Sequence, residues 1–79
     1  MASKPVTLGQ MCAGQSGVLG HPQLDEVPAT RLAELGVRQG QRIRLLQRSV
    51  GGTVVIDVLD ARIALDRATA GCIPITVDE

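Results

Sequence analysis

Hydrophobic and polar residues alternate through much of the second half of the chain, which is the pattern of half-buried β-strands. Residues 41–47 read QRIRLLQ and residues 53–59 read TVVIDVL. A glycine pair at 51–52 lies between them, as expected for a hairpin. The pattern predicts two paired strands here. Shorter segments predict further strands at 6–8, 17–21, 62–65 and 72–77, of which the first fits an extended arm equally well.

Residues 28–36 have the pattern of a short helix instead. Pro28 suits the first turn of a helix, where its missing N–H costs nothing. Leu32 and Leu35 are three residues apart and are predicted to face the core together. Gly36 then ends the helix as a left-handed cap.

Two further residues complete this prediction of the fold. Asp66 can cap a single helical turn through Ala70. Pro74 has no N–H to donate to a neighbouring strand, so residues 72–77 are predicted to form a strand at a sheet edge or at a bulge. The segments together predict one all-β domain over residues 1–79, built as a small barrel of about five strands with a short inserted helix.

The composition argues against a nucleic-acid-binding or secreted protein. The chain has 79 residues, no Phe, Tyr or Trp, and eight acidic and eight basic residues that give a formal net charge of zero. Nucleic-acid binding relies on excess basic charge and often on aromatic stacking. No apolar run is long enough for a signal peptide or a membrane span, so we expect a cytoplasmic protein with reduced thiols at Cys12 and Cys72.

The charges are nevertheless unevenly placed. Five arginines and one acid, Glu34, lie between residues 31 and 48, whereas acids predominate from residue 57 onward. Two explanations stay open: two solvated faces of opposite charge, or a patch that docks a partner. The second predicts one basic docking surface for an acidic partner, formed by Arg31, Arg38, Arg42 and Arg44.

Four segments in a fixed order resemble one protein family. RLAELGVRQG at residues 31–40 resembles the signature RL-x-x-LG-hydrophobic-x-x-G of the ferrous iron transport protein A family, FeoA. AGQSGV at 13–18, RIAL at 62–65 and AGCIPI at 70–75 resemble its early glycine turn, a later strand and its closing strand. The resemblance covers residues 6–77.

This resemblance implies an SH3-like barrel and a cytosolic accessory protein. Its implied partner is FeoB, a membrane ferrous iron transporter with a cytosolic GTP-binding domain, whose iron uptake it would modulate. The same fold occurs in iron- and manganese-dependent repressors, but the chain lacks their DNA-binding part. Three positions depart from the family pattern, where Gly-Asp-Pro, glycine and a basic residue are usual: Gly51-Gly52-Thr53, Asp60 and Asp66.

The residues offer little for catalysis, and we expect a binding protein and not an enzyme. His21 has no recognisable nucleophile motif near it, and the glycines lack the Lys-Ser/Thr ending of a phosphate loop. Cys12, His21 and Cys72 are the candidates for a transition metal site that would hold iron or zinc, although a surface histidine and two packed thiols explain them as well. A further alternative is a self-assembling module, a weak homo-oligomer in which aliphatic edge strands, such as residues 72–77, pair with a second copy.

Overall fold

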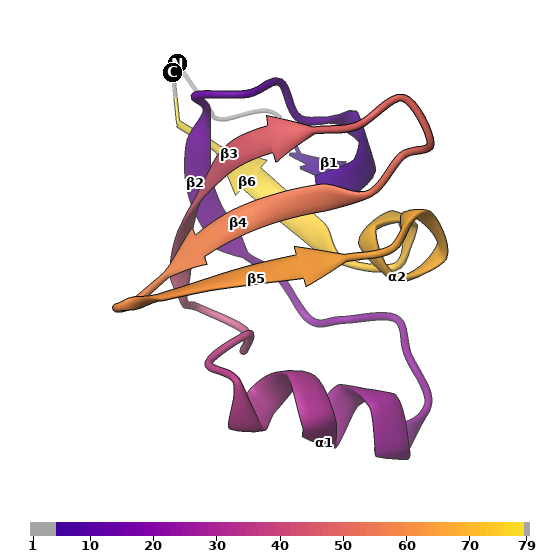
Figure 1. The fold of residues 1–79 in the computed structure, drawn as a ribbon. Helices are drawn as coiled ribbons and strands as arrows, with labels where there is room; N and C mark the ends of the chain where they lie inside the picture. Colours follow the sequence, from indigo (N-terminus) through magenta and orange to yellow (C-terminus); the bar gives the residue numbers. More distant parts are fainter. Residues whose placement is uncertain (1–4, 79) are drawn as a thin grey trace.

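The computed structural model describes residues 5–78 and arranges the alternating segments in one antiparallel sheet of six strands (Figure 1). The elements are β1 (Pro5–Thr7), the 3-10 turn η1 (Leu8–Gln10), β2 (Ser16–Leu19), α1 (Glu26–Glu34), β3 (Arg42–Arg48), β4 (Val54–Val58), β5 (Ala61–Leu65), α2 (Arg67–Gly71) and β6 (Pro74–Val77). The sheet has one strand more than the barrel of about five that was predicted. The additional strand is β1, whose segment the sequence predicted to be either a strand or an extended arm. Residues 1–4 and 79 of the predicted domain lie outside the described residues.

The strands follow the order β1-β6-β2-β3-β4-β5, and the sheet curls around one apolar core. β1 and β5 end this order, so the barrel is open between them. Alternate residues of each strand enter the core: in β4, Val54, Ile56 and Val58 are buried while Asp57 is exposed. Within residues 5–78, no polar or charged side chain is buried. The core is therefore apolar throughout and is built from Leu, Ile, Val, Ala and Met side chains.

Residues 74–77 form the predicted strand, but of the two positions predicted for it, a sheet edge or a bulge, the sheet edge is wrong. β6 lies inside the sheet, paired with β1 on one side and with β2 on the other. Pro74 is tolerated because it is the first residue of the strand, and its carbonyl still accepts the N–H of Gly20 at 2.8 Å. Self-assembly through this strand is excluded with it, since both of its edges are already paired.

The prediction that Leu35 faces the core is also wrong. Leu32 is buried, but Leu35 is 53% exposed, because α1 ends at Glu34 and the chain turns at Gly36 with a φ of 99°. Val37 returns to the helix, where its N–H donates to the Leu32 carbonyl at 2.8 Å, and its side chain fills the core instead. The left-handed conformation of Gly36 was predicted correctly. This turn is what places Val37, and not Leu35, in the core.

The short helix α2 begins as the sequence predicted. The Asp66 carboxylate accepts the N–H of Thr69 at 2.7 Å, which satisfies one of the free donors of the first turn. Hydrogen bonds from the Thr69 side chain and backbone lower the pKa of Asp66. α2 packs against η1 and closes one end of the barrel.

The contact between β2 and β6 is unusually close at Gly17. A Cβ atom at this position would lie 2.5 Å from the Thr76 carbonyl oxygen and 3.0 Å from Cγ1 of Ile75. Backbone cannot move aside as a flexible side chain can, so this position requires the absence of a side chain. We name the pairing of β2 with β6 around Gly17 the β2–β6 seam.

Candidate docking site

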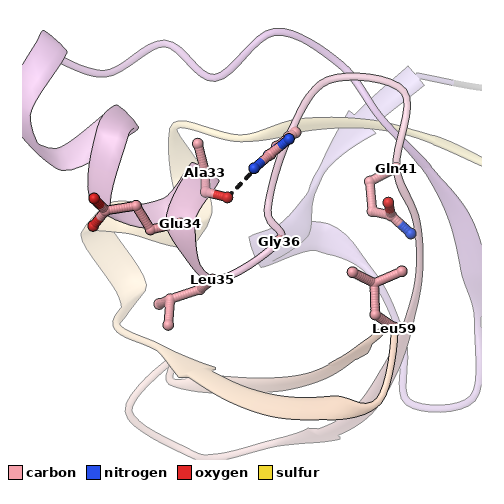
Figure 2. A pocket seen from close by; sticks show the side chains of 7 residues that line it. Ala33, Glu34, Leu35, Gly36, Gln41 and Leu59 are labelled. Carbon is pink, nitrogen blue, oxygen red and sulfur yellow. Dashed lines mark hydrogen bonds between the residues drawn. The ribbon is translucent and has the colours of Figure 1, made fainter.

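Two large apolar side chains remain exposed beside the C-terminal end of α1. Leu35 follows α1, and Leu59, which is 69% exposed, lies in the turn between β4 and β5. Both line a hollow of about 260 Å³, named here the leucine hollow, whose other lining residues are Ala33, Glu34, Gly36, Arg38 and Gln41 (Figure 2). Single exposed leucines are ordinary, but two that share one concave surface favour contact with a partner.

Leu59 also has an unfavourable backbone conformation. Its φ is 55°, and no other non-glycine residue within residues 5–78 has a positive φ. A leucine in the left-handed region costs roughly 1–2 kcal/mol relative to an ordinary conformation. Its Cδ1 lies over Gly36, where an added Cβ would approach it to 3.3 Å. An exposed leucine in a costly conformation contributes little to the fold, which is a reason to seek its role in binding.

Arginines border the leucine hollow. The Nε–H of Arg38 donates to the Ala33 carbonyl at 3.0 Å, which holds the guanidinium against the end of α1 and leaves its other N–H groups available (Figure 2). Arg31 lines an adjoining groove of about 270 Å³ between α1 and β5, and Leu35 lines both hollows. The only acid among the residues lining the leucine hollow is Glu34.

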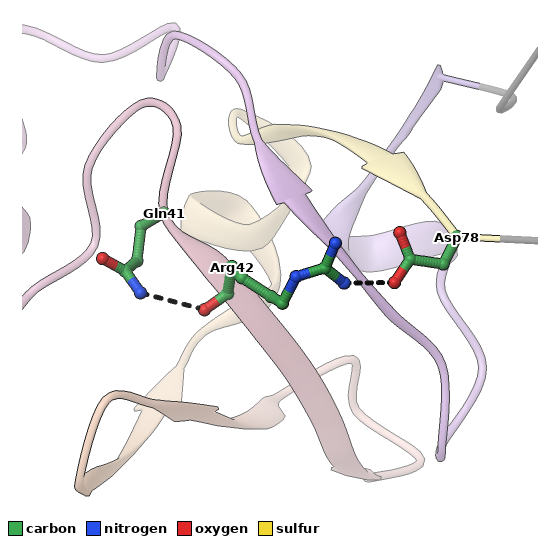
Figure 3. A network of polar contacts seen from close by, with 3 residues as sticks. All are labelled: Gln41, Arg42 and Asp78. Carbon is green, nitrogen blue, oxygen red and sulfur yellow. Dashed lines mark hydrogen bonds and ion pairs between the residues drawn. The ribbon is translucent and has the colours of Figure 1, made fainter.

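The outward face of β3 carries the other two predicted arginines. Arg42 forms an ion pair with Asp78 beyond the end of β6, next to Gln41 (Figure 3). Arg44 stands opposite Asp57 of β4, which in turn stands opposite Arg62 of β5. Acidic and basic side chains are thus neighbours on this sheet face, and the two charge blocks of the sequence do not form two separate faces.

The structure places the four predicted docking arginines in three settings. Arg42 and Arg44 share the exposed face of β3, Arg38 borders the leucine hollow, and Arg31 lines the adjoining groove. Sequence reasoning missed the two exposed leucines altogether. The sequence did indicate the turn in which Leu59 lies. Asp60 stands where the family pattern has glycine, and a glycine at that position is typical of a tight turn after β4.

The three candidate metal ligands do not gather into one site. Cys12 and His21 are exposed and Cys72 is half-buried; the cysteines are free thiols. The N–H of Gln23 donates to the Cys72 carbonyl at 2.7 Å, so the segment that follows His21 touches the one that contains Cys72. Across residues 5–78, however, no group of three or more His, Cys, Asp or Glu side chains is placed to hold a metal ion.

A comparison with models of protein families identifies the family of this chain. The model of the FeoA domain matches residues 6–77. The chain belongs to the FeoA family. This confirms the resemblance seen in the sequence and associates the chain with ferrous iron transport. No curated protein matches it, and no helix among the described residues has the length and apolarity needed to cross a membrane.

Solved structures agree with the FeoA assignment. An iron uptake regulatory protein (FeoA) shares 23% identity and a TM-score of 0.88, over 95% of this chain and 100% of that one. FeoA from Stenotrophomonas maltophilia, solved with zinc, shares 27% identity and a TM-score of 0.73 over 92% and 89% of the two chains. That protein is described as a prokaryotic SH3 domain protein and a candidate activating factor of ferrous iron transport.

The likeness extends to one domain of larger regulators. A manganese-dependent transcriptional repressor shares 19% identity and a TM-score of 0.83, over 96% of this chain but only 43% of that one. The predicted SH3-like fold is therefore confirmed, and the fold alone does not distinguish a transport accessory from part of a repressor.

Proposed function

We propose that this FeoA-family chain is a cytosolic accessory protein that docks on the cytosolic region of an FeoB-like ferrous iron transporter and modulates iron uptake. It acts by binding and catalyses no reaction of its own. The observation that carries the proposal is the family match over residues 6–77. The activating role suggested for the Stenotrophomonas maltophilia relative adds support.

The leucine hollow is the proposed centre of the docking surface. Its occupant is an apolar side chain within an acidic segment of the transporter. Leu35 and Leu59 supply the apolar contact, and Arg38 beside them, with Arg31 in the adjoining groove, supplies charge that an acidic segment complements. Arg42 and Arg44 form the outer part of the same proposed surface and act mainly on the rate of association.

The test is a titration of the transporter's full cytosolic region against the chain, without nucleotide and with GDP or a GTP analogue. A variant with Leu35→Ser and Leu59→Asn should bind at least about tenfold more weakly, as loss of a buried apolar anchor does. Val50→Ser is the matched control, because Val50 is a fully exposed apolar residue at the β3–β4 hairpin and does not line the hollow. Absence of binding in every nucleotide state, together with normal iron uptake in a deletion strain, would overturn the proposal.

Transition metal binding is the second candidate function, favoured by the zinc in the Stenotrophomonas maltophilia structure. Since the described residues do not gather three His, Cys, Asp or Glu side chains, a metal ion on Cys12, His21 or Cys72 would need further ligands from elsewhere. Zinc or ferrous ions should then raise the melting temperature in a concentration-dependent way. Replacement of Cys12, His21 and Cys72 by alanine should abolish the rise, and an unchanged wild-type melt in excess metal would exclude this function.

A further inference from the structure

A second hollow, polar and basic, lies at the opposite end of β4 from Leu59. The tip of the β3–β4 hairpin, η1 and the start of α2 border an open hollow of about 350 Å³. We name it the arginine hollow; it is lined by Gly9, Arg48, Ser49, Val50, Gly51, Gly52 and Arg67. Nothing in the proposed docking of the transporter uses it.

Arg48 is anchored at one side of the arginine hollow. Its Nη1 donates to the Met11 carbonyl at 3.1 Å, in a partly buried hydrogen bond between β3 and the turn that follows η1. A guanidinium has five N–H donors, so this bond fixes the group and leaves most of its donors for a ligand. Fixing the side chain in advance reduces the entropy that a ligand would otherwise have to offset.

Arg67 is held at the other side by its aliphatic stem. A Cβ added to Gly52 would lie 2.8–2.9 Å from Cβ, Cγ and Cδ of Arg67, so these three carbons lie directly over the glycine. Gly52 also has a φ of 92°, which other residues rarely adopt. The hairpin glycine therefore allows the stem of Arg67 to pack on the hairpin, and Arg67 lines the same hollow as Arg48.

No acid neutralises this pair of arginines. No carboxylate lines the arginine hollow. The ion pair found within residues 5–78 joins Arg42 to Asp78, and neither residue lines the hollow. Asp66, which precedes Arg67, is engaged elsewhere: its carboxylate caps α2 through Thr69 and lines the groove beside Leu35. Two arginines and a serine thus line one concave space, and no acidic residue lines it with them.

We propose that the arginine hollow is a phosphate-binding site, for free phosphate or for the phosphate of a small monoester. A doubly charged anion matches two arginines, and the planar fork of a guanidinium pairs with two oxygens of one phosphate. Ser49 adds a hydroxyl donor that both forms of the ligand can use. The volume of the hollow exceeds that of a single phosphate ion and leaves room for a small ester group.

The experiment is a titration of the ¹⁵N-labelled full chain with sodium phosphate, followed by amide chemical shifts at constant ionic strength. Saturable changes at millimolar phosphate are expected at Ser49–Gly52 and at Arg67, and Arg67→Gln should weaken the apparent affinity about tenfold. Arg62→Gln is the matched control, since it removes the same charge from β5 outside the hollow and should leave the affinity unchanged. Equal affinity in the Arg67→Gln and wild-type chains, or no saturable change at the hairpin, would overturn the proposal.

Two parallel titrations identify the ligand. Glycerol phosphate binding at least as tightly as inorganic phosphate assigns the site to phosphate monoesters, and binding of inorganic phosphate alone assigns it to the free ion; both support a phosphate site. Acetate that saturates the same amides at equal or lower concentration would overturn it in favour of a carboxylate site. Because the leucine hollow shares no lining residue with this site, failure here leaves the docking proposal untouched.

Discussion

Gly17 in β2 and Leu59 after β4 each occupy a position where the other residue type would be expected. A strand interior normally favours a side chain, yet Gly17 sits where the Thr76 carbonyl leaves no room for one. A turn with positive φ normally favours glycine, yet Leu59 has a φ of 55° and a side chain exposed to solvent. Packing within the fold explains the first choice and not the second. The β2–β6 seam is thus determined by structure, whereas the leucine hollow points to a role outside the folded chain.

The largest expected effect is at the seam. Gly17→Ala places a methyl group against backbone that cannot yield without breaking the β2–β6 pairing, so it should lower the free energy of unfolding by about 3 kcal/mol. Urea denaturation measures the loss directly. Gly51→Ala is the control, because open space surrounds that glycine and its φ is not positive, and it should change stability little. Equal stabilities of the two variants would show that the seam is not closely packed.

A smaller effect of opposite sign is expected at Leu59. Asparagine adopts the left-handed conformation more readily than leucine, so Leu59→Asn should raise the free energy of unfolding by about 1 kcal/mol. Leu59→Ala removes the exposed side chain but keeps the backbone cost, and should not stabilise the protein. Thermal and urea denaturation of the two variants separate these effects. A destabilised Leu59→Asn would mean that the side chain contributes to the fold after all.

The cap of α2 should give a modest dependence on pH. Because the pKa of Asp66 is lowered in the folded protein, its charged form stabilises the fold above the ordinary carboxyl pKa, and this contribution is lost as the pH falls through the lowered value. Asp66→Asn keeps a side-chain acceptor but does not titrate. The stability difference between wild type and variant should stay constant near neutral pH and shrink in acid. A difference that does not change with pH would contradict the role of the charge.

The smallest effect on stability is expected on the outward face of β3. The Arg42–Asp78 pair is exposed, and such pairs contribute at most about 1 kcal/mol. Replacement of Arg42 and Arg44 by glutamine removes both charges without setting like charges opposite each other, so it should change the melting temperature little while it slows association with an acidic partner and flattens the salt dependence. Replacement of Asp57 and Asp60 by asparagine should affect association much less. Loss of binding in the second variant but not in the first would place the docking face elsewhere.

Local sequence patterns predicted much of this fold. The alternation at 41–59, the glycines of the hairpin, the left-handed turn at Gly36 and the cap at Asp66 are each determined within a few residues. Leu35 was placed wrongly because α1 ends one residue before it and the chain turns at Gly36, and Pro74 because the pairing of β6 depends on a segment distant in sequence. Val37 takes the core position that Leu35 was expected to fill, and β1 covers the side of β6 that was expected to be open.

The candidate site was less predictable than the fold. The basic positions could be recognised from composition, but their grouping depends on strand register, which sets Arg44 opposite Asp57. The spacing of Leu35 from Leu32 predicted a core position, although Leu35 follows the end of α1, and Leu59 lies in a turn where no periodic pattern applies. The two hollows arise from segments far apart in the sequence, and only the folded chain brings them together.

Leu59 is expected to serve binding at the expense of stability. The decisive measurement is the affinity of wild type and Leu59→Asn for the cytosolic region of an FeoB-like transporter, taken beside their melting temperatures. The variant should melt at a higher temperature and bind at least about tenfold more weakly in the nucleotide state that favours docking. A variant that binds with wild-type affinity in every nucleotide state would contradict this expectation.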